Sequence, residues 1–155
     1  MRSLDTWLGE YADSHLNPTN KRLHYLCVPL ILLALMGLLQ SIPVPPALAE
    51  RSPYLNWASL AMLAGLIYYA ALSMRLALGM LLVVLAGFGL LGLLARLSLP
   101  LWLSCLAIFV LAWIGQFIGH AIEGKRPSFF KDLQFLLIGP LWILAALFRR
   151  LGVPY

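Results

Sequence analysis

The stretch AWIGQFIGHAIEGKRPSFF, residues 112–130, completes an apolar segment suited to a membrane and then passes into a basic loop. Its polar residues Gln116, His120 and Glu123 are spaced i, i+4, i+7. At about 100° per residue, these side chains fall within about 60° of one another on one face of an α-helix. An ionisable group near hydrocarbon costs about 3 kcal/mol unless it is paired, hydrated or bound. The stripe therefore predicts that other parts of the chain supply partners to this face.

The composition indicates an integral membrane protein. Of the 155 residues, 62% are hydrophobic and 11% are charged, whereas soluble domains average about 45–50% and about 25%. The net charge of +5 does not indicate binding to nucleic acid, because the eleven basic residues are scattered at the ends of apolar segments. Cys27 and Cys105 both lie inside apolar runs, which argues against a disulfide framework. Residues 1–20 are polar and lack the apolar core of a cleavable signal peptide.

We expect a single all-α domain over residues 1–155, a polytopic membrane helix bundle with an amphipathic helix at its N-terminus. This first helix, within residues 1–16, is suited to lying on the membrane surface. Its apolar face is made of Leu4, Trp7, Leu8 and Tyr11. Asn17 followed by Pro18 is typical of an N-cap and first helical residue, so the first membrane helix should begin there.

Five apolar runs predict four to five transmembrane helices. They cover residues 25–40, 55–74, 76–95, 101–120 and 133–148. A proline-rich loop, residues 41–53, follows the first run, and Arg75 is expected to mark a tight turn between the second and third. The last run contains Gly139 and Pro140 and is short for a crossing of about 20 residues, so we expect it to be kinked, tilted or re-entrant.

The distribution of basic residues predicts a cytoplasmic N-terminus, in what we expect to be a bacterial inner membrane. If all five runs cross, the cytoplasmic side carries Arg2, Lys21, Arg22, Arg75, Lys125, Arg126 and Lys131. The other side then carries only Arg51, Arg96, Arg149 and Arg150. The positive-inside rule favours this orientation, and the bias is stronger if the last run turns back. The start of the first membrane helix and the end of the fourth then lie on the same side.

This orientation places all three histidines of the chain, His15, His24 and His120, at the same rim of the membrane. Sites of three histidines, or of two histidines and a carboxylate, hold transition metals and leave coordination positions open. The shared depth allows a metal site but does not prove that the rings converge, since each histidine could be satisfied by backbone or lipid headgroups. Asn17 and Asn20 fit helix caps, although Asn20 lies four residues before His24 and could orient its ring.

The other polar residues near this rim also have simpler roles open to them. Glu123 could form an ion pair with Lys125 or Arg126. Gln116 could hydrogen-bond to a neighbouring helix.

Two motifs near the ends of the chain closely resemble the membrane family of 2-hydroxy fatty acid dioxygenases, which includes a yeast enzyme of phytosphingosine breakdown and bacterial relatives. The first motif is Tyr11-x-x-x-His15-x-Asn17-Pro18-x-Asn20-x-x-x-His24, continuing to Val28-Pro29. The second is Trp113-Ile-x-Gln116-Phe-Ile-Gly119-His120-x-x-Glu123-Gly124-x-Arg126-Pro127, continuing to Gly139-Pro140. The middle helices match the family only as apolar spans.

The resemblance implies an iron(II)-dependent reaction with dioxygen that shortens a 2-hydroxy fatty acid by one carbon without 2-oxoglutarate. It implies that His15, His24 and His120 are the iron ligands, with Glu123 as a fourth ligand or a base. The surrounding residues would be Asn17, Asn20 and Gln116. Lys21, Lys125 and Arg126 would be the cations that could neutralise the carboxylate of the substrate. The expected partners are the 2-hydroxy acid, dioxygen and membrane lipid, and the oligomeric state is left open.

Two other classes of function remain open at this point. The same rim could bind lipid headgroups in a non-catalytic or scaffold membrane protein. The same ligands could also hold zinc in a membrane hydrolase, since coordinating residues do not name their metal. A transporter is disfavoured because the centres of the runs carry no strongly polar side chain apart from Gln116. A di-iron desaturase would need more histidines than the chain has.

Overall fold

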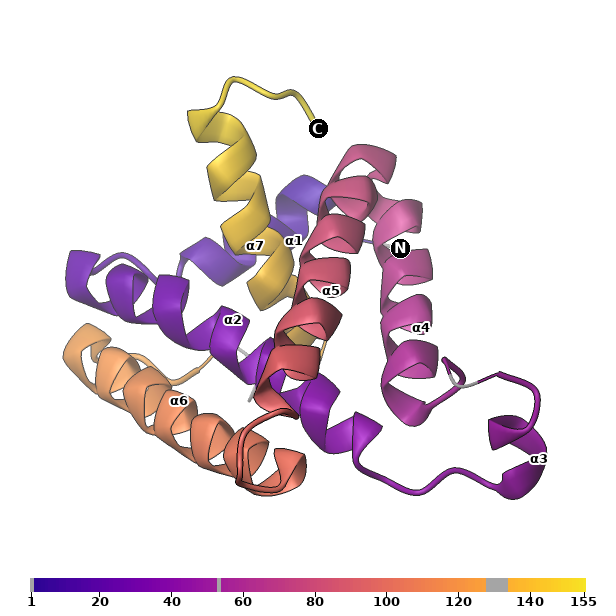
Figure 1. Cartoon of the computed structure of the whole chain (residues 1–155). Coiled ribbons are helices and arrows are strands. Elements are labelled where there is room, and N and C mark those ends of the chain that lie inside the picture. Colours follow the sequence, from indigo (N-terminus) through magenta and orange to yellow (C-terminus); the bar gives the residue numbers. More distant parts are fainter. Residues whose placement is uncertain (1, 53, 128–133) are drawn as a thin grey trace.

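The computed structural model describes residues 2–52, 54–127 and 134–155, and the regular elements in these ranges are all helices (Figure 1). Their order is α1 (Leu4–Ala12), α2 (Pro18–Gln40), α3 (Pro46–Ala49), α4 (Trp57–Leu72), α5 (Met74–Leu94), α6 (Leu101–Glu123) and α7 (Phe135–Arg150). The expected all-α class is therefore confirmed. The short helix α3 lies inside the segment that was expected to be a proline-rich loop.

Three helices are long and apolar enough to cross a membrane: α2 with 23 residues, α5 with 21 and α6 with 23. A helix rises about 1.5 Å per residue, so a hydrocarbon core about 30 Å thick needs about 20 residues. The helices α4 and α7 have 16 residues each, fewer than that length requires. The helix α7 contains Pro140 in its interior, and the expectation that the last run is kinked, tilted or re-entrant stays a prediction.

The first membrane helix begins where the Asn17-Pro18 pair predicts. The Oδ1 atom of Asn17 accepts a hydrogen bond of 2.8 Å from the backbone N–H of Thr19, and Pro18 occupies the first turn of α2. Proline is favoured there because its missing N–H would have no partner in the helix. The boundary predicted from local capping is thus correct.

The turn between α4 and α5 is made by Ser73, so the assignment of this turn to Arg75 was wrong. Ser73 has extended backbone angles, φ −161° and ψ 117°, and its Oγ accepts a hydrogen bond of 3.3 Å from the N–H of Leu76. Serine breaks the helix because its hydroxyl can replace a missing backbone acceptor at a helix start. Arg75 lies within α5, and its guanidinium donates a hydrogen bond of 3.3 Å to the carbonyl of Pro154.

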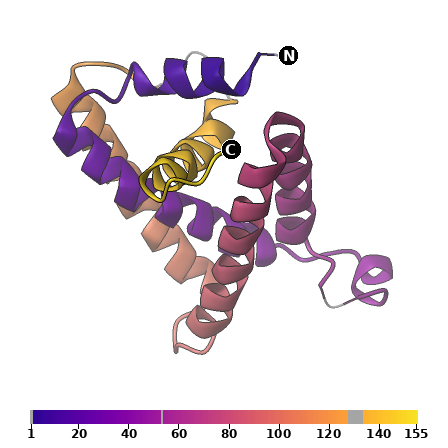
Figure 2. The same cartoon turned by 90° about the horizontal axis from the view of Figure 1, so that it is seen from above.

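The helices α2 and α6 pack closely side by side, as both views show (Figures 1 and 2). They run antiparallel, with Gly119 facing Asn20 near one end and Gly37 facing Cys105 near the other. A Cβ at either glycine would collide with the opposite side chain. Small residues allow the two backbones to approach this closely, as is common between membrane helices.

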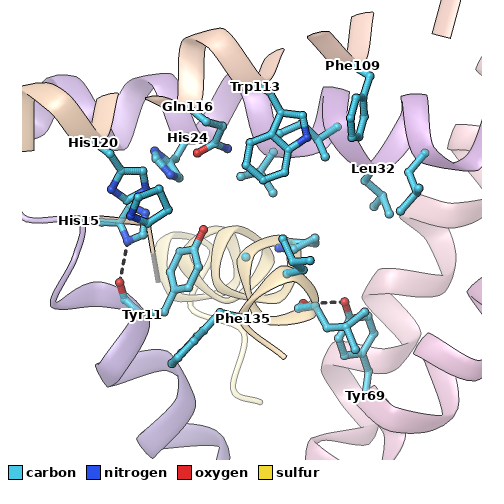
Figure 3. Close-up of a pocket in the computed structure, with 18 of the residues that line it drawn as sticks. Tyr11, His15, His24, Leu32, Tyr69, Phe109, Trp113, Gln116, His120 and Phe135 are labelled. Carbon is cyan, nitrogen blue, oxygen red and sulfur yellow. Dashed lines mark hydrogen bonds between the residues drawn. The ribbon is translucent and has the colours of Figure 1, made fainter. Parts of the chain in front are cut away.

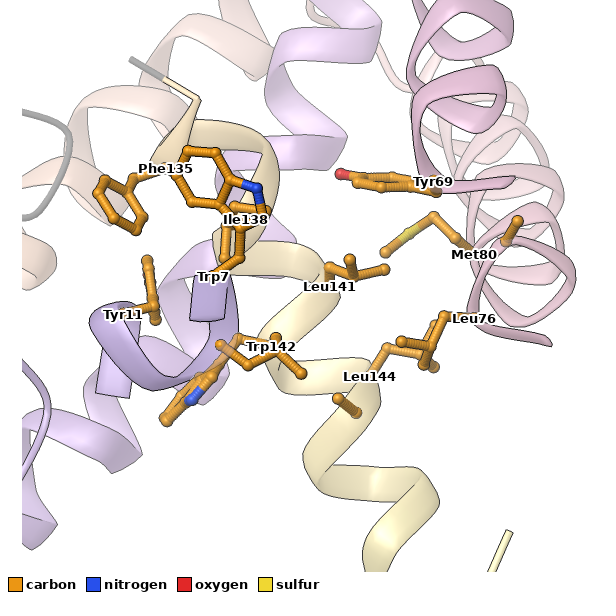
Figure 4. Packing of buried hydrophobic residues seen from close by; sticks show 13 residues of the cluster. Trp7, Tyr11, Tyr69, Leu76, Met80, Phe135, Ile138, Leu141, Trp142 and Leu144 are labelled. Atoms are coloured by element: carbon orange, nitrogen blue, oxygen red, sulfur yellow. The ribbon is translucent and has the colours of Figure 1, made fainter. Parts of the chain in front are cut away.

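The apolar face of α1 is covered by protein. Trp7 and Tyr11 are buried and contact α7, with the Trp7 and Phe135 rings 5.1 Å apart and the Tyr11 and Trp142 rings 5.4 Å apart (Figure 4). The predicted amphipathic helix is therefore present, and its apolar side chains pack on α7. That the exposed face of α1 lies at a membrane surface stays a prediction.

Candidate metal centre

Three elements distant in sequence bring the histidines together. His15 lies in the loop between α1 and α2, His24 in the second turn of α2, and His120 in the last turn of α6. Their ring centroids are 4.1 Å apart for His15 and His24, 4.8 Å for His24 and His120, and 5.0 Å for His15 and His120. All three side chains are at least 95% buried. The convergence that the sequence left open is therefore present in the structure (Figure 3).

Two of the rings are oriented by backbone carbonyls four residues earlier in the chain. The Nδ1 atom of His15 lies 2.6 Å from the carbonyl oxygen of Tyr11, and Nδ1 of His24 lies 3.0 Å from that of Asn20. A carbonyl only accepts hydrogen bonds, so both Nδ1 atoms carry the proton. The Nε2 atoms of His15 and His24 therefore keep their lone pairs in the neutral rings, as metal ligation requires.

The donor set fits a metal ion. Nε2 of His15 and Nδ1 of His120 are buried and have no hydrogen-bond partner among the described residues. Buried polar atoms are normally satisfied, so orphaned nitrogens facing one another indicate a missing partner. One nitrogen from each histidine lies within 4.8 Å of the others. Because metal–nitrogen bonds of about 2 Å allow ligand atoms up to about 4 Å apart, small ring movements would complete a three-nitrogen site.

The surroundings of His15 hold its ring neutral. Burial lowers the pKa of His15 to about 4, although the hydrogen bond to the Tyr11 carbonyl opposes this effect. The Tyr11 ring also stacks on the imidazole, with centroids 4.3 Å apart and planes 13° from parallel. A ring that stays unprotonated at neutral pH is available as a ligand.

Glu123 makes a different set of contacts from those first expected. Its Oε1 accepts a hydrogen bond of 2.9 Å from the N–H of Leu16, and its Oε2 accepts bonds of 2.8 Å from the N–H of Asn17 and 3.0 Å from Nδ2 of Asn20. No ion pair of Glu123 with Lys125 or Arg126 occurs among the described residues. The carboxylate therefore joins the end of α6 to the loop that carries His15.

Asn20 lies at the centre of this junction. Its side chain is fully buried, and Nδ2 also donates a hydrogen bond of 3.2 Å to the carbonyl of Ser14. Its own carbonyl holds His24, as described above. Asn20 thus contacts the segment before His15, the end of α6 and the ring of His24. Asn17 contributes its backbone N–H to Glu123 and its side chain to the cap of α2.

The three cations predicted near the site differ in their surroundings. Lys21 is half-buried and close enough to His15 to influence its protonation. Lys125 is exposed and donates a hydrogen bond of 2.6 Å from Nζ to the carbonyl of Asp13, which ties α1 to the end of α6. Arg126 is exposed. Lys21 and Lys125 therefore bring positive charge close to the segment that carries His15.

An apolar cavity of about 270 Å³ opens from the histidine cluster. His15, His24, His120 and the buried Gln116 line one end, and Leu32 and Phe109 lie at the other (Figure 3). The walls come mainly from α2, α6 and α7. A site with a polar cluster at the head of an apolar cavity suits an amphiphilic molecule.

Sequence reasoning missed Tyr11 as a part of the site, although it belongs to the first motif. Tyr11 orients His15 through its carbonyl and ring and lines the cavity. The available signal was spacing, since Tyr11 precedes His15 by four residues just as Asn20 precedes His24. Trp142 of α7, whose ring lies 5.5 Å from that of His15, had no comparable signal.

Comparison with known proteins agrees with the family resemblance of the two motifs. The sequence matches the protein family described as 2-hydroxy-palmitic acid dioxygenase Mpo1-like over residues 1–151. It is 30% identical over 151 residues to the 2-hydroxy-palmitic acid dioxygenase MPO1 of Saccharomyces cerevisiae, covering 96% of this chain and 82% of the yeast protein. No solved structure matches the chain with significance.

Proposed function

The chain belongs to the Mpo1-like family of 2-hydroxy-palmitic acid dioxygenases, and on this basis we propose that it is an iron(II)-dependent dioxygenase that shortens 2-hydroxy fatty acids by one carbon. The observation that carries the proposal is the convergence of three buried imidazoles at the polar end of an apolar cavity. This arrangement favours an enzyme over a headgroup-binding protein, because a site for a headgroup has no need of orphaned, buried nitrogens.

In the proposed mechanism, Nε2 of His15, Nε2 of His24 and Nδ1 of His120 hold the metal. Iron(II) in this position would supply the redox chemistry that activates dioxygen. The protein buries all three rings, and it fixes the orientation of two of them through the carbonyls of Tyr11 and Asn20. Burial of the cluster also limits the access of bulk water.

The cations at the rim are proposed to bind the carboxylate of the substrate. Lys21 is the strongest candidate because it is half-buried and close to His15. Lys125 and Arg126 would add positive charge at the exposed entrance. Gln116, one helical turn before His120, lines the cavity and would hydrogen-bond to the polar head of the substrate.

Glu123, Asn17 and Asn20 are proposed to position the histidines. The carboxylate of Glu123 already accepts three hydrogen bonds, two of them from the backbone just after His15. In this role Glu123 contributes to the metal centre by holding the α1–α2 loop against α6. We also propose that the site lies at the cytoplasmic rim of a bacterial inner membrane.

The proposal is tested by metal analysis after anaerobic purification, together with oxygen uptake on 2-hydroxypalmitate. The wild-type protein should hold stoichiometric iron and consume oxygen only with the 2-hydroxy acid. His120→Ala should lose the iron, and its rate should fall by more than about 100-fold, since even changes around a ligand cost about 10–100-fold. The control is Phe117→Ala, because Phe117 lies on the same helix and is 48% exposed.

Three results would contradict the proposal. Full consumption of 2-hydroxypalmitate by the metal-free protein would show that the histidines do not act through a metal. Stoichiometric zinc with hydrolytic activity would assign the site to a hydrolase. A wild-type protein that binds no metal would indicate a non-catalytic role.

A further inference from the structure

We propose that the cavity is the binding site for the acyl chain and that its far end, bounded by Met62 and Phe109, sets the length of chain accepted. This inference rests on the proposed function, because it takes the polar head of the substrate to lie at the histidines. It goes further by assigning residues that select among 2-hydroxy acids of different lengths.

The cavity runs alongside α2 and α6, in the direction of the helix axes. On α2 the lining residues after His24 are Val28, Ile31, Leu32 and Leu35, and on α6 the lining residues before His120 are Gln116, Trp113 and Phe109. Both sets are spaced at helical intervals, and the last residue of each lies eleven positions from the histidine, so each helix presents one continuous lining face. Apart from Gln116, the lining changes from imidazole to apolar side chains within one turn of the histidines.

The length of this lining face corresponds to that of a long acyl chain. Eleven residues of helix extend over about 16 Å at about 1.5 Å per residue. Carbon–carbon bonds of about 1.5 Å advance an extended chain by about 1.3 Å per carbon, so about 12 carbons fit between the histidines and the far end. This is close to the tail of 2-hydroxypalmitic acid beyond its hydroxyl-bearing carbon.

Two side chains bound the far end of the cavity. Met62 of α4 and Phe109 of α6 line the cavity there, and both pack against a buried cluster of the bundle. The cluster consists of Ala34, Met36, Val84, Leu91 and Cys105. A chain that continues along α2 and α6 past this end meets Met62 and Phe109 and then the buried cluster, so extra methylenes in this direction require side chains to move.

One side of the cavity is open to the surroundings of the bundle. Leu136 and Leu137 of α7 line the cavity and are 46% and 40% exposed, and Leu35 of α2 is 40% exposed. These apolar side chains lie where a membrane would supply lipid. A fatty acid already dissolved in the bilayer can therefore enter sideways, with its tail leading between α2 and α7.

The test measures dissociation constants of 2-hydroxylauric, 2-hydroxypalmitic and 2-hydroxyarachidic acids on the full-length chain in detergent micelles. The probe is displacement of radiolabelled 2-hydroxypalmitic acid, so the readout does not depend on turnover. Each methylene that becomes buried should tighten binding about fourfold. The wild-type protein should bind 2-hydroxypalmitic acid most tightly of the three.

Two variants should shift this preference in opposite directions. Phe109→Ala opens the far end and should raise the affinity for 2-hydroxyarachidic acid relative to 2-hydroxypalmitic acid by about tenfold or more. Leu32→Trp places a larger ring about 12 Å from His24 along α2 and should shift the preference toward 2-hydroxylauric acid. The matched controls are Leu111→Ala on α6 and Leu26→Trp on α2, which replace side chains that are 69% and 61% exposed.

The outcomes separate this inference from the proposed function. If the wild-type protein binds the acids and both folded variants keep the wild-type chain-length profile, the assignment of the cavity is wrong. If Phe109→Ala does not fold, Leu32→Trp decides the question by itself. If the profile shifts as expected but the iron-loaded wild-type protein consumes none of the acids, the acyl site stands and the proposed reaction is wrong.

Discussion

The carboxylate of Glu123 joins residues more than 100 positions apart in the chain through three hydrogen bonds. Two of the donors are the backbone N–H groups of Leu16 and Asn17, which directly follow His15. The third is the side chain of Asn20, whose carbonyl orients His24. One side chain in the same helical turn as His120 therefore contacts the segment that follows His15 and the residue that orients His24.

Glu123→Gln is expected to weaken both the fold and the metal site. A glutamine amide offers only one acceptor oxygen. Its NH₂ group would face an N–H donor that the second carboxylate oxygen now accepts from, so at least one of these hydrogen bonds is lost. Hydrogen bonds to charged groups contribute about 1.5–3 kcal/mol, and we expect the free energy of unfolding to fall by about 2 kcal/mol together with the metal affinity. Denaturant unfolding in detergent and equilibrium metal titration measure the two effects.

The matched control is Glu10→Gln on the exposed face of α1, where Glu10 pairs with Arg2 at 3.2 Å. Exposed ion pairs contribute at most about 1 kcal/mol, so this variant should resemble the wild type. If Glu123→Gln retains wild-type stability and metal affinity, Glu123 does not position the cluster.

The α2–α6 pair is the element that holds the proposed metal centre together. His24 and His120 lie on facing sides of these helices, and Gly119 lies directly opposite Asn20. A Cβ at Gly119 would collide with Oδ1 of Asn20 and touch Leu23. The missing side chain at Gly119 is thus what allows Asn20 to reach Glu123.

Gly119→Ala is expected to destabilise the protein by about 1–3 kcal/mol, the usual cost of overpacking, and to lower metal affinity by displacing Asn20. The control is Gly92→Ala in α5, where nothing lies within 4 Å of an added Cβ. Gly92→Ala should be neutral or stabilise the protein by up to about 1 kcal/mol, because alanine favours a helix over glycine. Equal effects of the two substitutions on stability and metal content would contradict this view of the helix pair.

At the scale of the whole molecule, both ends of α7 contact residues on the N-terminal side of the bundle. Phe135 at its start packs on Trp7, and Arg150 at its end lies over the ring of Tyr25 with a separation of 5.9 Å. The Arg75–Pro154 hydrogen bond also places the C-terminal segment beside the α4–α5 turn. These contacts favour the re-entrant alternative for the last apolar run.

We therefore predict that the N- and C-termini lie on the same side of the membrane. Single cysteines at Ser3, Ser98 and Val153, with Cys27 and Cys105 replaced by alanine, can be labelled with an impermeant maleimide in oriented vesicles. Ser3→Cys and Val153→Cys should react from one side, and Ser98→Cys, between α5 and α6, from the other. Reaction of Val153→Cys together with Ser98→Cys would show instead that α7 crosses.

This topology would also increase the charge asymmetry. Arg149 and Arg150 would join the basic residues on the N-terminal side, which leaves Arg51 and Arg96 on the opposite side. The positive-inside rule then favours a cytoplasmic N-terminus more strongly than five full crossings would.

The sequence by itself determined the helical membrane class and the start of α2, and it singled out His15, His24 and His120 as candidate metal ligands. These features follow from local properties, namely apolar segment length, the Asn17-Pro18 cap and the rarity of ionisable residues in such a chain. Local signals misplaced the α4–α5 turn by two residues, because a charge was taken as the break where a serine cap makes it.

Only the tertiary structure decided that the histidines converge, that Glu123 is engaged by the α1–α2 loop and that α7 covers the apolar face of α1. Each of these features depends on contacts between segments far apart in the chain, such as the bond between Leu16 and Glu123 across 107 positions. Periodicity can place a residue on a helix face, but the element that covers that face is set by helix packing. The histidine cluster lies where the cap of α2 meets the end of α6, and close packing of these two helices brings His24 and His120 together.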